Sequence, residues 1–83
     1  LDQASLLDLW QWNKETFLAK TEGSPLRRTG YQSFMRNIAI GLGNAPFNSA
    51  IIESLEQNKL LHDDIVQVHI NWAIQEQLKK CQN

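Results

Sequence analysis

Apolar side chains recur every three or four positions along most of the chain, which is the spacing of residues on one face of an α-helix. No alternation of apolar and polar residues persists over five positions, so β-strands are not expected. The pattern therefore predicts an all-α protein of about five helices. Their expected ranges are 5–12, 13–23, 25–42, 49–58 and 65–80.

The expected helix boundaries carry residue types that start or stop helices. The candidate N-caps, whose side chains accept a free backbone N–H, are Ser5, Asn13, Ser24 and Asp63 or Asp64. Pro25 suits the first helical position, where no N–H is needed. Gly23 is a stop signal, and Gly43 with Asn44 can adopt the left-handed conformation that ends the long helix before Pro46.

Short connections between the helices predict antiparallel neighbours. The third and fourth helices are expected to form one hairpin and the fifth to begin another, as in helical-repeat solenoids. The broadest apolar stripe comprises Tyr31, Phe34, Met35, Ile38 and Leu42. Trp10 and Trp72 are likewise expected in the core, and Trp12, near a helix end, is the expected exposed exception. Gly41 is expected to allow two helices to approach closely.

Length and composition limit what the chain can be. Eighty-three residues form one small domain, residues 1–83, whose 42% hydrophobic content can supply a core. The chain opens without Met on an amphipathic segment, which favours a piece of a longer protein. Its single Cys81 excludes an internal disulfide and a cysteine-based metal site, and fits a reducing, cytoplasmic setting. No apolar run approaches the length of a membrane span, so no membrane partner is expected.

Charge is distributed unevenly, although the net charge is only −1. Residues 23–52 contain no Asp or Glu and hold all three arginines, whereas residues 53–64 hold four acidic residues and one lysine. Arg28, Gln32 and Arg36 are four residues apart, which predicts a stripe along the third helix. Guanidinium groups bind phosphate oxygens in a forked geometry, so Arg27, Arg28 and Arg36 are candidate RNA-backbone contacts, with Gln32 and Lys20 as weaker ones.

Other chemistry is less supported by the residues. The arginines could instead lie in solvent or pair with acidic residues of neighbouring helices. Ser24 and the first N–H groups of the third helix could also meet a phosphate. His62 and His69 span the start of a helix and do not form a metal site, so His69 is expected to be half-buried with one hydrogen-bond partner. Neither a catalytic residue nor a cofactor-binding residue is expected in this chain.

Residues 22–46 contain a set of residues in a recognisable order. Gly23-Ser24 is followed by Arg27-Arg28, Tyr31, Phe34, Arg36-Asn37 and Leu42-Gly43-Asn44-Ala45, in that order. Upstream lie Trp12, Asn13 and Phe17, and downstream Val66, His69, Trp72 and Ala73. This pattern resembles the C-terminal region of tRNA epoxyqueuosine reductases. It departs from that family at Gln67 and Val68, where the family has Arg and Glu.

The resemblance implies a fold and a function. It implies a C-terminal HEAT-like helical domain of the PBS-lyase type, non-catalytic itself, which binds the phosphate backbone of the tRNA anticodon stem–loop. The parent oxidoreductase would reduce epoxyqueuosine to queuosine at the tRNA wobble position, a step of queuosine biosynthesis. Its cobalamin and two 4Fe-4S clusters would be held by upstream catalytic domains, which are the second expected partner, and none by this chain.

Two rivals remain open at this point. The first is a helical-repeat module for protein–protein interaction without RNA contact, which an exposed apolar groove would favour over a continuous positive strip. The second is a domain that only braces the catalytic domains. Bracing predicts that Leu6, Leu9, Trp10 and Trp12 are exposed once the rest of the protein is removed.

Overall fold

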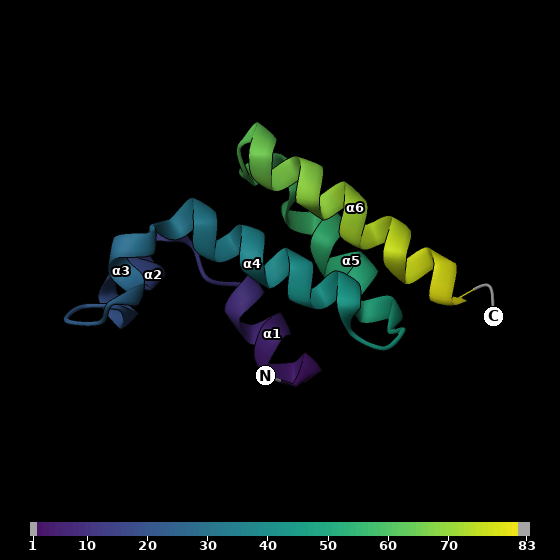
Figure 1. Ribbon diagram of the computed structural model, residues 1–83, viewed down its shortest axis with the longest axis horizontal. Coiled ribbons are helices and arrows are strands. Elements are labelled where there is room, and N and C mark those ends of the chain that lie inside the picture. Colours follow the sequence, from purple (N-terminus) through teal and green to yellow (C-terminus); the bar gives the residue numbers. More distant parts are fainter. Residues whose placement is uncertain (1, 82–83) are drawn as a thin grey trace.

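The computed structural model describes residues 2–81, and within that range every regular element is helical. The elements, coloured along the chain in Figure 1, are α1 (Gln3–Trp10), α2 (Lys14–Lys20), α3 (Leu26–Thr29), α4 (Tyr31–Asn44), α5 (Ser49–Asn58), the 3-10 helix η1 (Lys59–Leu61) and α6 (Asp64–Cys81). The all-α prediction is confirmed. The HEAT-like assignment stays a prediction.

Local capping accounts for most helix starts. The Asn13 side chain accepts from Thr16 N at 2.8 Å, and Asp63 Oδ1 accepts from Val66 N at 2.9 Å, so both predicted caps are confirmed. The predicted cap Ser5 is wrong. Asp2 Oδ1 accepts from Ser5 N at 2.8 Å, so α1 begins earlier than expected. Because the Asp2 carboxylate accepts this hydrogen bond, its pKa is lowered below the usual 3.8.

The expected long helix at 25–42 is two helices, because Gly30 interrupts it. Gly30 has φ 89° and ψ 156°, a conformation that glycine adopts and other residues avoid. The four-residue α3 therefore ends at Thr29 and α4 starts afresh at Tyr31. Gly23, with φ 76°, lies in the turn between α2 and α3, and α2 ends before it, at Lys20.

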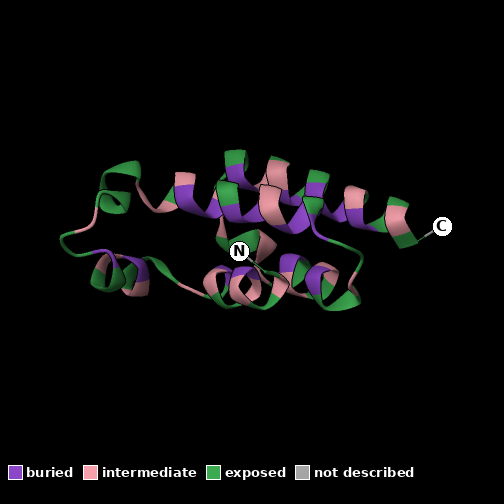
Figure 2. Cartoon of the chain, turned by 60° about the horizontal axis from the view of Figure 1, so that its bottom comes forward, coloured by how far each residue is buried: buried purple, intermediate pink, exposed green. Residues whose placement is uncertain are grey.

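The core lies mainly between α4 and α6, which form the most extensive helix–helix interface. In Figure 1, α4 and α6 run in the same general direction, and α5, which lies between them in the sequence, runs back in the opposite direction. The third expected helix was predicted to pair with the fourth; instead α4 packs mainly on α6 and little on α5. Figure 2 shows buried residues on the faces that the helices turn toward one another. The largest fully buried side chains include Trp10, Phe17, Met35, Leu42, Ile51, Leu55 and Ile70.

Two glycines of α4 provide space for neighbouring helices. A Cβ on Gly43 would lie 2.6 Å from Trp72 Cζ3 and 2.9 Å from Ala73 Cα of α6. A Cβ on Gly41 would lie 3.3 Å from a methyl group of Leu6, so the predicted role of Gly41 in close helix approach is supported. Gly43 was expected to end the helix in a left-handed conformation, which is wrong. It is helical, and α4 continues to Asn44.

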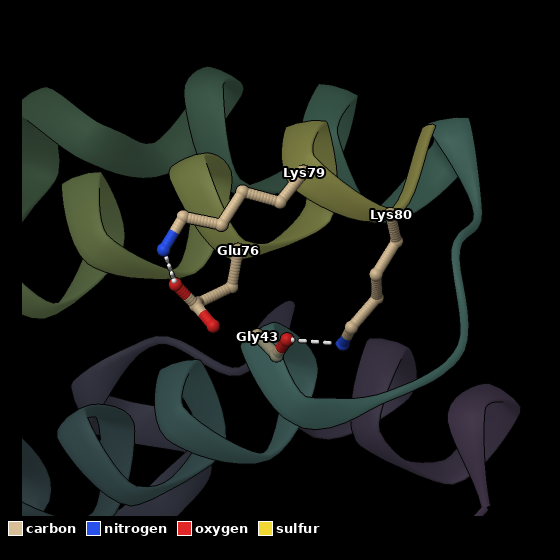
Figure 3. Close-up of polar contacts among 4 residues, drawn as sticks. All are labelled: Gly43, Glu76, Lys79 and Lys80. Atoms are coloured by element: carbon tan, nitrogen blue, oxygen red, sulfur yellow. Dashed lines mark hydrogen bonds and ion pairs between the residues drawn. The ribbon is translucent and has the colours of Figure 1, made fainter. Parts of the chain in front are cut away.

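Side chains of α6 close the C-terminal end of α4. Gln77, fully buried, donates to Leu42 O at 2.8 Å and Ala45 O at 2.9 Å, and accepts from Asn48 N at 3.0 Å. Lys80 Nζ donates to Gly43 O and Ala45 O, both at 2.7 Å. Figure 3 shows Lys80 directed at the Gly43 carbonyl. The last carbonyls of α4 are thus bound by a neighbouring helix.

Candidate RNA-binding surface

Arg27 and Arg28 lie on α3, at the end of the molecule farthest from the C-terminus of α6 (Figure 1). All four α3 residues are exposed, and the helix is green along its whole length in Figure 2. With Gly23, Ser24 and Pro25 the two arginines line a surface depression of about 520 Å³. The depression is open and basic, and no acidic side chain lines it.

The turn that carries these arginines is anchored to the core. Thr21 is buried and its Oγ1 donates to Phe17 O at 2.6 Å. Ser24 N donates to Thr21 O at 2.9 Å, and Ser24 Oγ accepts from Leu26 N at 3.2 Å. The Ser24 hydroxyl therefore already holds one N–H at the start of α3. This network positions the backbone beneath Arg27 and Arg28 while their side chains face solvent.

Lys20, Gln32 and Arg36 have different surroundings. Lys20 is exposed at the end of α2, which lies at the same end of the molecule as α3 (Figure 1). Gln32 and Arg36 follow on α4, where they line a small hollow of about 90 Å³ together with Asp63. With its amide oriented to satisfy both groups, Gln32 donates to the two Asp63 carboxylate oxygens at 3.1 and 2.8 Å.

The predicted stripe of Arg28, Gln32 and Arg36 is therefore not continuous. Arg28 precedes the break at Gly30, so it does not share a helical row with the other two. Gln32 and Arg36 remain one turn apart on α4. The structure brings Arg27 and Arg28 together in one depression, and places Arg36, which is half-buried, beside a carboxylate.

None of the three arginines forms an ion pair within residues 2–81. Over that range the only ion pair joins Lys79 Nζ to Glu76 Oε2, at 2.8 Å on α6 (Figure 3). The alternative in which the arginines pair with acidic residues of neighbouring helices thus does not describe Arg27 and Arg28. Among residues 2–81 no partner occupies the donors of their guanidinium groups, so these donors can bind a ligand.

The burial of the aromatic residues differs in part from the prediction. Trp10 and Phe34 are buried as expected, and Trp10 Nε1 donates to Ser54 O at 2.9 Å. Trp12 is half-buried and stacks on Phe34 with ring centroids 5.6 Å apart. Trp72, expected in the core, is exposed at the surface of α6. Helical spacing carried a signal for this, because Trp72 shares a side of α6 with the exposed Ile65 and Val68, whereas Val66, Ile70 and Ala73 form the buried side.

Both histidines are half-buried and occupy separate places. His69 Nδ1 bonds to Ile65 O at 2.8 Å, which confirms the expected single partner. The His62 ring lies 5.1 Å from Trp10 and 6.1 Å from Tyr31. Burial lowers the pKa of His62 below 6.5, while the nearby Asp63 carboxylate opposes the shift. Among the described residues no group of three or more His, Cys, Asp or Glu could hold a metal ion.

Fold and surface together describe a small all-α domain with a basic end. Sequence comparison then gives the particular relatives. The chain is 46% identical over 74 residues to the epoxyqueuosine reductase of Pseudomonas aeruginosa, covering 89% of this chain and 20% of that protein. It is 48% identical over 79 residues to that of Shewanella oneidensis and 42% identical over 80 residues to that of Escherichia coli.

The chain is thus homologous to a segment of epoxyqueuosine reductases, and the resemblance given by its motifs is confirmed. It spans about a fifth of the length of the curated relatives it matches. No protein-family model matches it, and neither does any solved structure.

The residues of this chain do not fit the iron–sulfur clusters that the resemblance implies for the parent enzyme. Such a cluster is held by several cysteine thiolates, whereas the sequence has only Cys81, exposed in the last turn of α6. No helix in the described part of the chain is both long and apolar enough to cross a membrane.

Proposed function

We propose that this chain is the C-terminal, non-catalytic RNA-binding module of an epoxyqueuosine reductase. Its basic end, formed by Arg27, Arg28 and Lys20, binds the phosphate backbone of the tRNA anticodon stem–loop. The module holds the tRNA while upstream domains, with their cobalamin and iron–sulfur clusters, reduce epoxyqueuosine to queuosine. The setting of this reaction is the cytoplasm.

The observation that carries the proposal is that two adjacent arginines, which form no ion pair within residues 2–81, line one depression. Arg27 and Arg28 are adjacent, exposed and free of ion pairs within residues 2–81, over a turn fixed by Thr21 and Ser24. A polyanion gains most from cations that are not already neutralised, because each phosphate contact then releases a counterion. Arg36 is a weaker contact in this arrangement, since Asp63 shares its hollow.

Two observations favour the rival protein-interaction module. The basic residues do not form a continuous strip along α4, and an apolar hollow lies elsewhere, between α4 and α6. The bracing alternative, in contrast, predicts that Leu6, Leu9, Trp10 and Trp12 are exposed. Leu6 and Trp10 are buried, and Leu9 and Trp12 are half-buried. The basic end and the apolar hollow are separate surfaces, so an RNA contact and a protein contact can coexist in one module.

Binding of the 83-residue chain to a fluorescently labelled anticodon stem–loop RNA tests the proposal. Fluorescence anisotropy over a series of salt concentrations gives the slope of log K against log salt, to which each phosphate contact contributes about 0.7–0.9. Replacing both Arg27 and Arg28 by Gln is expected to weaken binding and reduce the slope by about 1.4–1.8. Arg36→Gln is expected to have a smaller effect.

The matched control is Lys79→Gln, which removes one positive charge from α6 at the opposite end of the molecule. Its binding is expected to stay close to that of the unmodified chain. If Lys79→Gln weakens binding as much per charge removed as the double replacement of Arg27 and Arg28, only net charge matters, and salt-independent binding would exclude a phosphate contact. Either result overturns the proposal.

A further inference from the structure

An apolar stripe runs along the flank of α6 that lies beside α4 and is open to solvent. Ile65, Val68 and Trp72 are spaced three and four residues apart, which places them on one side of the helix. They are 63%, 64% and 39% exposed, while Val66, Ile70 and Ala73 on the inner side are buried. Leu60 and Leu61 of η1, immediately before α6, are 86% and 80% exposed.

The stripe borders a real concavity. Val68 and Trp72 line a hollow of about 450 Å³ between α4 and α6, together with Ile40, Asn44 and His69. The lining carries no Asp, Glu, Lys or Arg, and its surface is mostly apolar. The hydrogen bond between His69 Nδ1 and Ile65 O orients the His69 ring, which lines one side of the hollow. We call Ile65, Val68 and Trp72 the α6 face.

This composition discriminates between classes of partner. A nucleic acid needs cations, and the hollow offers none. Large exposed apolar groups that adjoin an uncharged concavity are typical of a surface that another protein segment covers. A full-length relative supplies such a segment, because about four fifths of its length has no counterpart in this chain.

We infer that the α6 face packs against the remainder of a full-length epoxyqueuosine reductase, as an interface within one polypeptide. The inference rests on the proposal that the chain is a module of such an enzyme, but not on RNA binding. Docking through α6 leaves α3 and its arginines, at the far end of the molecule, open to solvent (Figure 1). The two surfaces would then serve separate contacts.

Thiol labelling compares the α6 face in two settings. The first is the isolated 83-residue chain, and the second is the Escherichia coli reductase with its homologous segment, 42% identical, replaced by this chain. Both carry Val68→Cys with Cys81→Ser, and labelling is located by peptide mass spectrometry. Val68→Cys is expected to react at least about tenfold more slowly in the full-length enzyme. Leu26→Cys on α3, which is also exposed, is the control and is expected to react equally in both.

A second variant tests the same face through stability. Ile65→Asp adds a charge at an exposed position, so the Tm of the isolated chain is expected to stay the same, while that of the full-length protein falls. Equal labelling of Val68→Cys in both settings, or an unchanged Tm of the full-length Ile65→Asp protein, overturns the inference. Concentration-dependent protection of Val68→Cys in the isolated chain would assign the face to a second copy and also overturn it. No readout involves RNA, so failure here and failure of RNA binding are distinguishable.

Discussion

Replacement of Gly43 by alanine tests the contact between α4 and α6 most directly. The new Cβ would lie 2.6 Å from Trp72 Cζ3 and 2.9 Å from Ala73 Cα. The exposed Trp72 ring can turn aside, but Ala73 Cα is backbone, so α6 as a whole must shift. Overpacking of this kind costs about 1–3 kcal/mol. Alanine in place of a helical glycine contributes about 1 kcal/mol in the opposite direction.

The expected net result is a loss of about 1 kcal/mol, which lowers the Tm of a domain of this size by roughly 4–8 °C. Thermal and urea unfolding followed by far-UV circular dichroism measure it. Gly41→Ala is the matched control, since it makes the same change in the same helix. Its Cβ meets only methyl groups of Leu6, at 3.3 and 3.4 Å, which can move. Gly41→Ala is therefore expected to raise stability by about 0.5–1 kcal/mol.

Opposite signs for the two variants are the decisive outcome. If Gly43→Ala stabilises the protein as Gly41→Ala does, helix propensity alone governs both sites. The close approach of α4 and α6 described above would then be wrong. A similar loss from both would instead mean that the contact of Gly41 with α1 is as rigid as that of Gly43 with α6.

Three further predictions concern other parts of the fold. Gly30→Ala is expected to cost about 1–3 kcal/mol, because its φ of 89° strains any other residue; a neutral change with increased helicity would favour one continuous helix. Gln77→Leu removes the partner of the Leu42 carbonyl and of the Asn48 N–H, while Ala45 O keeps its bond from Lys80. At about 1–3 kcal/mol for a buried unsatisfied group the change should lower the urea midpoint clearly, whereas an unchanged midpoint would argue against this cap. Burial lowers the pKa of His62 below its unfolded value of 6.5, so the free energy of unfolding should fall as pH drops through 6.5, and His62→Gln should flatten that dependence; rising stability over the same range would contradict the sign.

The sequence alone determined the features that depend on neighbouring residues. Helical periodicity predicts the all-α class, and α5 spans the predicted residues 49–58. Asn13 and Asp63 were predictable caps because the bond each forms reaches only three residues along the chain. The arginines of the candidate site were also visible, since no acidic residue accompanies them in residues 23–52.

Tertiary structure decided which surfaces face one another and which stay open. Periodicity shows that a helix has an apolar side, but not which helix covers it, so the pairing of α4 with α6 was missed. Gly30 permits both a helix and a break, and packing selected the break that separates Arg28 from Arg36. Trp72 is large and apolar like a core residue, yet it stays 39% exposed at the edge of the interface between α4 and α6, because burial depends on contacts between residues distant in sequence.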